Sequence, residues 1–193
     1  MYKIYTVNIE DAISEMQKSI NKKENAAFFV ESNKKFAYVP EWWYHPEVNP
    51  QETIDLFAQY NITPYNMFYA APLNKGVIIG APGDLSFLVM RPYDENNSIF
   101  AEFEPKLVSF MQSKFPNSVL DENDYLIDGK KAIGSVGNIL DGMVLYMFMA
   151  SFVDNSELIN ILCPPGHTKV PQPINSEILT KEEFKNEIIT WLQ

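Results

Sequence analysis

Apolar positions in the first half of the chain follow helical spacing first and then form short runs. An amphipathic helix is predicted by apolar residues at helical spacing: Ile9, Ala12, Ile13, Met16 and Ile20. Two apolar runs, at 26–30 and 36–39, predict strands joined by a polar connection. A second helix is expected to start at 49–52, because asparagine is a good N-cap and proline fits the first helical position.

The second half of the chain predicts strands and hairpins with helices between them. Strands are expected at four places: 67–71, 76–80, 85–90 and 145–153. The strongest turn signal is Asp128-Gly129, a favoured two-residue turn, between predicted strands at 125–127 and 130–133. Helices are expected from Pro105 to Pro116, at 154–162, and after a capping box at 180–183.

This alternation of helices with hairpins is typical of the α+β class. We therefore expect a mixed β-sheet flanked by helices. The length of 193 residues predicts a single domain that spans 1–193. Hydrophobic residues make up 46% of the chain, which is near the globular average and excludes a disordered chain.

Charge and cysteine content narrow the function classes. The chain has 15 lysines and arginines against 25 aspartates and glutamates, a net charge of −10, and Arg91 is its one arginine. Such an acidic chain without a basic run is a poor binder of nucleic-acid phosphates. The single cysteine, Cys163, fits a reducing compartment. His45 and His167 lack the partner cysteines of a zinc pattern.

No membrane segment is expected. The longest apolar stretch, 142–153, is shorter than the ~20 residues that cross a bilayer. The first residues reach Glu10 and Asp11 without a charged-then-apolar signal region. These patterns predict a cytoplasmic protein.

A glycine-rich turn is the first candidate for chemistry. Gly76, Gly80 and Gly83 surround a turn between two apolar strands. Glycine lets the backbone pass close to a ligand and leaves amide N–H groups free to donate. The alternative is an ordinary hairpin that needs glycine for its backbone angles.

The Asp128-Gly129 hairpin carries the second candidate. Cross-strand pairing places Lys131 opposite Leu126, on the side of the sheet that Ile133 shares. Lys130 points to the other side, with Ile127 and Ala132. Both sides are apolar, so a lysine here is costly unless its ammonium meets an anion. The alternative is that the ammonium groups reach solvent at the end of the hairpin.

Two further groups could serve either a ligand or the core. Cys163, near His167, could be a nucleophile. The commoner behaviour of a lone cysteine is that of a small buried apolar side chain. The aromatic run 42–46 could line an apolar pocket or a partner surface, or fill the core under a loop.

The order of these motifs resembles the lipoate–protein ligase and octanoyltransferase family, whose relatives are the biotin–protein ligases. The stretch 47–49 reads Glu-Val-Asn, as in that family. The stretch 80–85, Gly-Ala-Pro-Gly-Asp-Leu, is similar to the transferases' His-Gly-Pro-Gly-Gln-Leu. The resemblance implies the α+β catalytic core of this family.

The best match lies between Asn123 and Ser135. The ligases carry Asn-Asp-Leu, then Asp-Gly-(Lys/Arg)-Lys, then Gly-Ser or Gly-Asn, and this chain has the same pieces in order. Lys131 takes the position of the family lysine that holds the acyl carboxylate and the adenylate phosphate. The resemblance implies that the other matching positions shape the nucleotide or acyl site: Gly76, Gly80, Gly83, Asn123, Asp124, Gly134 and Ser135.

The resemblance implies transfer of lipoate or octanoate to a lysine of a lipoyl-type carrier domain. In the ligases this needs ATP and Mg²⁺, whereas in the octanoyltransferases a cysteine forms a thioester, and Cys163 falls near that cysteine's place. The ligases' arginine pair is replaced by Ala70 and Ala71, and their two histidines by Gly80 and Asp141. These losses support an alternative, a catalytically inactive relative that serves as a binding or regulatory module.

Overall fold

The computed structural model describes residues 1–39, 55, 57–66, 78–157 and 170–193. The helix start predicted at 49–52 and the strand predicted at 67–71 lie outside these residues, as does most of the helix predicted at 154–162. The described part contains helices and a mixed sheet, so the predicted α+β class is confirmed. No helix within it is long and apolar enough to cross a membrane.

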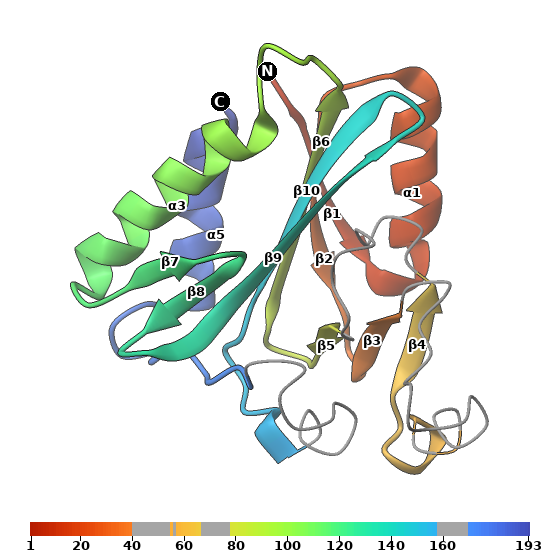
Figure 1. Cartoon of the computed structure of the whole chain (residues 1–193). Helices are drawn as coiled ribbons and strands as arrows, with labels where there is room; N and C mark the ends of the chain where they lie inside the picture. The colour runs from red at the N-terminus through yellow and green to blue at the C-terminus, as the bar shows by residue number, and fades with distance from the viewer. Residues whose placement is uncertain (40–54, 56, 67–77, 158–169) are drawn as a thin grey trace.

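A seven-stranded sheet forms the centre of the molecule (Figure 1). From edge to edge its strands are β1 (Lys3–Asn8), β2 (Ala26–Glu31), β6 (Leu85–Pro92), β10 (Met143–Ala150), β9 (Lys130–Leu140), β8 (Asp124–Ile127) and β7 (Val119–Asp121). The β1–β2 pair is parallel, and every other pair is antiparallel. The sheet is therefore mixed, as expected.

A second, three-stranded sheet lies beside it (Figure 1). Its central strand is β3 (Phe36–Val39), which pairs in parallel with β4 (Thr63–Asn66) and antiparallel with β5 (Ile78–Gly80). The predicted strand at 36–39 is confirmed with its bounds. The predicted strand at 76–80 is confirmed over its described part, 78–80.

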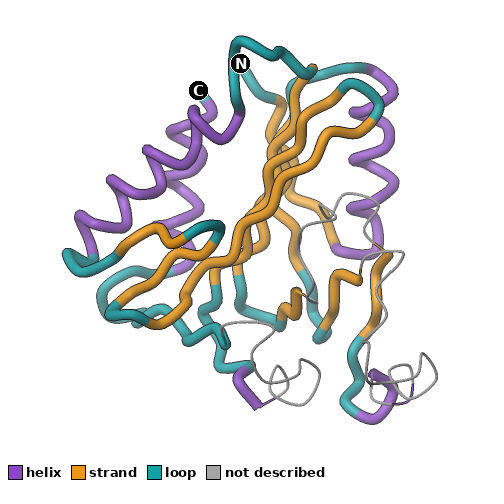
Figure 2. The backbone as a smooth tube through the Cα atoms, viewed as in Figure 1, coloured by secondary structure: helices purple, strands orange, loops and turns teal. Residues whose placement is uncertain are grey.

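Helices cover both faces of the large sheet (Figures 1 and 2). One face carries α3 (Ile99–Lys114) and α5 (Lys181–Leu192), and the other carries α1 (Ile9–Lys22). The periodic apolar residues of the first predicted helix give α1 its buried side. The capping box predicted at 180–183 is confirmed, since Thr180 and Glu183 exchange both hydrogen bonds at the start of α5.

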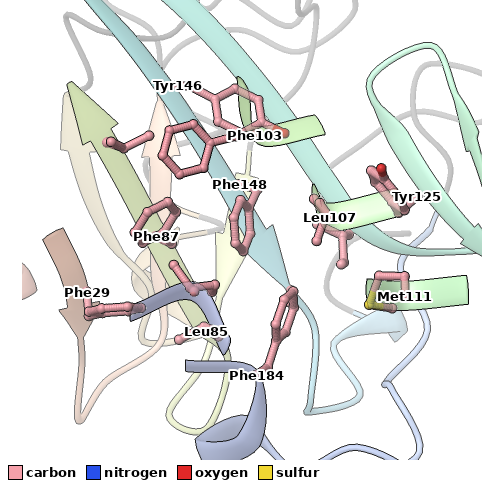
Figure 3. Packing of buried hydrophobic residues seen from close by; sticks show 14 of the residues in the cluster. Phe29, Leu85, Phe87, Phe103, Leu107, Met111, Tyr125, Tyr146, Phe148 and Phe184 are labelled. Atoms are coloured by element: carbon pink, nitrogen blue, oxygen red, sulfur yellow. The ribbon is translucent and has the colours of Figure 1, made fainter. Parts of the chain in front are cut away.

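The two faces of the sheet are filled by different side chains. The α3/α5 face is rich in phenylalanine, and Figure 3 shows Phe148 surrounded by Phe87, Phe103 and Phe184. The α1 face is rich in methionine: Met16, Met90, Met143, Met147 and Met149. Methionine is unbranched and polarisable, so it adapts to irregular neighbours better than an aromatic ring does. We call these the phenylalanine face and the methionine face.

Two hairpins are closed by Asp-Gly turns with left-handed backbone angles. Asp128 and Gly129 have φ of 50° and 76°, so the predicted turn between β8 and β9 is confirmed. Asp141 and Gly142 have φ of 49° and 73° and join β9 to β10 in the same way. Both residues of such a turn need positive φ, which glycine and aspartate adopt most easily.

The start predicted for the helix at Pro105 is wrong, because α3 begins six residues earlier, after a Ser98 cap. Proline in a helix interior removes one backbone hydrogen bond, which made a helix start the simpler interpretation. Burial overrides this cost: Ile99, Phe103 and Met111 recur on one side of α3 and are buried against the sheet, while Pro105 is exposed. The helix ends before Pro116, as predicted.

Candidate functional site

The β8–β9 hairpin brings a lysine and an aspartate together. The Nζ of Lys131 lies 2.7 Å from Oδ1 of Asp124, and their side chains are 15% and 20% exposed. Asp124 begins β8, and Lys131 is the second residue of β9, so the Asp128-Gly129 turn sets their approach. The predicted anion for the lysine is therefore a residue of the same hairpin. Lys130, its neighbour in sequence, is exposed, which matches the alternative that an ammonium reaches solvent.

A bulge in the hairpin decides which residues of β9 share a side with Lys131. Lys131 pairs with Leu126, as predicted, but the register shifts between Tyr125 and Leu126. Ala132 and Ile133 consequently both lie on the phenylalanine face, and the strict alternation of side chains is broken. The prediction that Lys131 shares a side with Ile133 is wrong for this reason.

Gly134 provides the space for the Lys131 side chain. A Cβ atom at Gly134 would lie 3.0 Å from Cε and 3.1 Å from Nζ of Lys131, and 3.8 Å from Oδ1 of Asp124. Gly134 pairs with Asp124 on one side and Met149 on the other. Because paired residues share a face of the sheet, the ion pair lies on the methionine face. The predicted residues Asp124, Lys131 and Gly134 thus meet at one place.

Asn123 and Ser135 hold the neighbouring turn. The backbone N–H and the hydroxyl of Ser135 both donate to the carbonyl oxygen of Asn123, at 2.8 Å and 3.0 Å. Ser135 is buried and pairs with Phe148 of the phenylalanine face, opposite the ion pair. The hydrogen bonds between these two predicted residues therefore fix the β7–β8 turn, which lies directly before Asp124. Their binding of a nucleotide or acyl group stays a prediction.

The glycines of the predicted turn are tightly packed. A Cβ atom at Gly80 would overlap the Phe36 ring, and one at Gly83, whose φ is +109°, would lie 2.8 Å from Cγ2 of Val153. Gly83 thus needs glycine for its backbone angle, and Gly80 for its packing against Phe36. The alternative of an ordinary hairpin is wrong, because β5 pairs with β3 in the small sheet while β6 belongs to the large one. The role of these glycines as amide donors stays a prediction. Gly76 and Cys163 lie outside the described residues.

Asp84, which follows this turn, is a buried carboxylate to which the sequence analysis gave no role. Its side chain accepts from the N–H groups of Ala81 (2.9 Å), Phe152 (2.8 Å) and Val153 (3.0 Å), and from Nδ2 of Asn155 (3.0 Å). Asp84 is 5% exposed. A signal was present in the sequence: an aspartate directly before a long apolar strand either caps a turn or needs internal partners.

Burial raises the pKa of Asp84 above its ordinary value of 3.8, and the hydrogen bonds offset part of this rise. The folded protein therefore takes up this proton at a higher pH than the unfolded chain. We expect the contribution of Asp84 to the free energy of unfolding to be largest below pH 3.8 and to fall as pH rises through the raised pKa. Urea unfolding of wild type and Asp84→Asn over this range measures the difference. A difference that grows with pH would contradict the assignment.

Arg91, the one arginine of the chain, has partners in another part of the fold. Arg91 forms an ion pair with Glu102, and its Nη2 donates to the carbonyl oxygen of Asn97 at 2.8 Å. The one arginine therefore holds the loop before α3. Within the described ranges, no group of three or more histidine, cysteine or acidic residues could hold a metal ion. What the described site offers chemically is a half-buried ammonium, suited to a carboxylate or a phosphate.

Comparison with solved structures finds this fold in lipoate ligases. A lipoate protein ligase from Thermoplasma acidophilum with bound lipoic acid has a TM-score of 0.73 at 12% identity, over 99% of this chain and 84% of that chain. LipL1 of P. falciparum in complex with lipoate has a TM-score of 0.70 at 15% identity, over 98% and 61% of the two chains. A lipoate-protein ligase A bound with ATP gives 0.64 at 14% identity, over 100% and 82%.

A biotin protein ligase from Leishmania major has the fold as well, with a TM-score of 0.53 at 10% identity, over 98% of this chain and 73% of that chain. No family model matches the sequence, and no curated protein matches it. The chain thus has the α+β fold of the catalytic core that lipoate and biotin protein ligases share. The resemblance stated from the sequence is confirmed at the level of the fold, with strong divergence in sequence.

Proposed function

We propose that this protein moves a medium-chain acyl group, lipoate or octanoate, to a lysine of a lipoyl-type carrier domain. The observation that carries the proposal is the Lys131–Asp124 pair beside Gly134, placed on the methionine face of a lipoate-ligase fold. Lys131 binds the acyl carboxylate or its activated form. One structural neighbour is a bi-partite lipoate protein ligase studied with its E2 lipoyl domain, which supports a carrier of this kind.

The ion pair leaves Lys131 able to bind a second anion. An ammonium has three N–H donors, and the bond to Asp124 uses one of them. The side chain keeps 15% exposure, so a ligand can reach it without unfolding the hairpin. Asp124 holds the ammonium in place before the ligand arrives, which lowers the cost of ordering a long side chain on binding.

We favour transfer from an acylated donor over ATP-dependent ligation. Adenylation concentrates negative charge on phosphates, and the ligases' arginine pair is replaced here by Ala70 and Ala71. In the transferase route, the Cys163 thiolate attacks the acyl carbonyl and the donor thiol leaves. The carrier lysine then attacks the thioester, forms the amide and releases the Cys163 thiol. ATP and Mg²⁺ would be used only in the ligase route.

The proposal extends to the cellular location and to the kind of partner. A cytoplasmic location is supported by the single cysteine, which suits a reducing compartment. Nucleic acid is a poor candidate for a partner, because a net charge of −10 repels phosphate backbones.

A second candidate, an inactive relative that binds a ligand or regulates a partner, is favoured by a specific observation. Three cations of the described residues are half-buried in ion pairs, and all of them already have carboxylate partners: Arg91, Lys131 and Lys185. Acidic carrier domains are also repelled by a chain with a net charge of −10. This candidate retains the fold and the binding of a small acid but performs no acyl transfer.

Intact-mass spectrometry separates these possibilities. The purified protein is incubated with octanoyl-carrier protein, with octanoyl-adenylate, or with octanoate, ATP and Mg²⁺, and an apo lipoyl domain is then added. Cys163→Ala is the matched variant, because it removes the thiol and little volume. The folded state of each protein is checked by circular dichroism.

The outcomes differ in kind. A thioester adduct that transfers to the lipoyl domain and is absent in Cys163→Ala supports the transferase. Transfer that needs ATP and survives in Cys163→Ala supports the ligase. Folded protein that gives neither adduct nor transfer with any donor contradicts the proposed function and supports the inactive relative.

A further inference from the structure

Three separate segments meet beside Lys131 through hydrogen bonds of their backbones. The N–H of Ser151 donates to the carbonyl oxygen of Ala132 at 3.0 Å, and the N–H of Gln172 donates to that of Lys131 at 2.7 Å. The N–H of Ile174 donates to the carbonyl oxygen of Ser151 at 2.8 Å, which closes the set. The start of β9 is therefore tied to the segments 151–155 and 172–174.

Asp84 joins the glycine turn to this junction. One oxygen of its carboxylate accepts from Phe152 and Val153, and the other accepts from Ala81 and Asn155. The turn 81–84 and the segment 151–155 are thus bridged by one side chain with four donors. Gly83 packs against Val153 at the same contact.

The Asp84 carboxylate occupies a small anion-binding site that is formed by other residues of the same chain. Three backbone N–H groups and one side-chain amide converge on it, and burial removes water from the contact. Among the described residues, N–H donors surround this charge and no ion pair involves it. A buried carboxylate that lacks some of its hydrogen-bond donors costs folding free energy. We therefore expect the four hydrogen bonds to Asp84 to form and break cooperatively.

From this arrangement we infer that Asp84 is a positioning residue for the Lys131 site. Its carboxylate fixes the turn 81–84 against the segment 151–155. That segment is hydrogen-bonded to Ala132 directly, and it is linked to Lys131 through the segment 172–174. Loss of the carboxylate releases the turn and loosens the start of β9. The inference rests on the proposed function only for its kinetic consequence, because the setting of Lys131 can be measured without any acyl transfer.

Three variants test the inference in the full-length protein. Asp84→Asn replaces one accepting oxygen by an NH₂ group, which then faces N–H donors. Asp84→Gly empties the site and leaves its four donors in place. Asp154→Asn is the matched control, since it removes a charge from an exposed aspartate of the same segment and keeps the oxygen that Ser156 uses.

The first measurement is the rate at which acetic anhydride modifies Lys131 relative to Lys130, read by peptide mass spectrometry. Lys130 is exposed and serves as the internal reference. We expect both Asp84 variants to raise the ratio about threefold or more, because local opening exposes the Lys131 amine. Asp154→Asn is expected to leave the ratio unchanged.

The second measurement is rescue by a small carboxylate. Formate fits the site that Asp84→Gly vacates, so formate, and not the same concentration of chloride, is expected to return the labelling ratio toward that of wild type. Asp84→Asn still fills the site, so formate is expected to have no effect on it. A ratio equal to that of wild type in folded Asp84→Asn would overturn the inference, as would equal responses to formate and chloride.

The kinetic measurement applies once carrier acylation is observed for the wild type. We expect Asp84→Asn to lower kcat about tenfold or more with little change in the KM for the carrier, because small misplacements of reacting groups are costly. Absence of transfer in the wild type would contradict the proposed function and leave the labelling and formate results to decide on Asp84. A change in KM alone would contradict positioning.

Discussion

Lys131→Met is expected to lower carrier acylation about 100-fold or more, which corresponds to roughly 3 kcal/mol of transition-state stabilisation. Methionine keeps the unbranched side chain up to the ε position and removes the ammonium. The negative charge that develops on the acyl oxygen, or that resides on an activated acyl group, then loses its charged donor. Steady-state transfer to the lipoyl domain measures the effect, with the carrier and the acyl donor varied separately.

The matched control is Lys130→Met, which makes the same change at the neighbouring, exposed residue. We expect it to retain activity within about twofold, since exposed charges contribute little. A double-mutant cycle with Asp124→Asn tests the pair: if Asp124 acts through Lys131, its variant adds little once Lys131 is methionine. Equal losses in Lys131→Met and Lys130→Met would contradict a specific role for Lys131 and point to net charge.

The hairpin that carries Lys131 shows what local sequence rules can predict. Asp128-Gly129 predicts its turn because so few dipeptides accept two positive φ values in succession. Counting outward from the turn places Lys131 opposite Leu126, as the structure has it. The same count fails two residues later. The bulge places one extra residue, Ala132, in β9 opposite the step from Tyr125 to Leu126, and no residue type between Lys131 and Gly134 predicts it.

The sequence pattern predicts that Lys131 meets an anion, but it does not predict which residue supplies that anion. The apolar pattern on both sides of β9 implies that a lysine there needs an anion. The count from the turn already places Asp124 on the side of Lys131, because Lys131 pairs with Leu126 and Asp124 lies two residues before Leu126. The bulge adds Gly134 to that side and so gives the ion pair its space. The sequence resemblance named Asp124 for another purpose, as part of the nucleotide or acyl site.

Asp84 and α3 show where sequence rules fall short for a related reason. Three of the four donors to Asp84 come from residues about 70 positions further along the chain, at separations of 68, 69 and 71. No local pattern reveals them. Pro105 was interpreted as a helix start from its backbone alone, whereas burial of Ile99, Phe103 and Met111 against the sheet extends α3 past it. Local rules succeed for turns and caps and fail where tertiary burial decides.

Phe148→Ala is expected to lower the free energy of unfolding by about 3–5 kcal/mol, a large share of the roughly 5–15 kcal/mol of a typical domain. Phe148 is fully buried at the centre of the phenylalanine face (Figure 3). Its ring centroid lies 5.1 Å from that of Phe87 and 5.7 Å from that of Phe184. Truncation removes these contacts and leaves a cavity between β10 and α5, which rigid aromatic neighbours fill poorly.

Met147, the preceding residue, provides the comparison because it is also buried and points to the opposite face. We expect Met147→Leu to cost less than about 1.5 kcal/mol, since the volume is conserved and methionine-rich surroundings adapt. Ile139→Ala, at a residue 52% exposed, should stay within about 0.5 kcal/mol. Urea unfolding gives all three values from shifts of the midpoint at constant slope. Similar losses for Phe148→Ala and Met147→Leu would contradict a rigid aromatic face opposite an adaptable one.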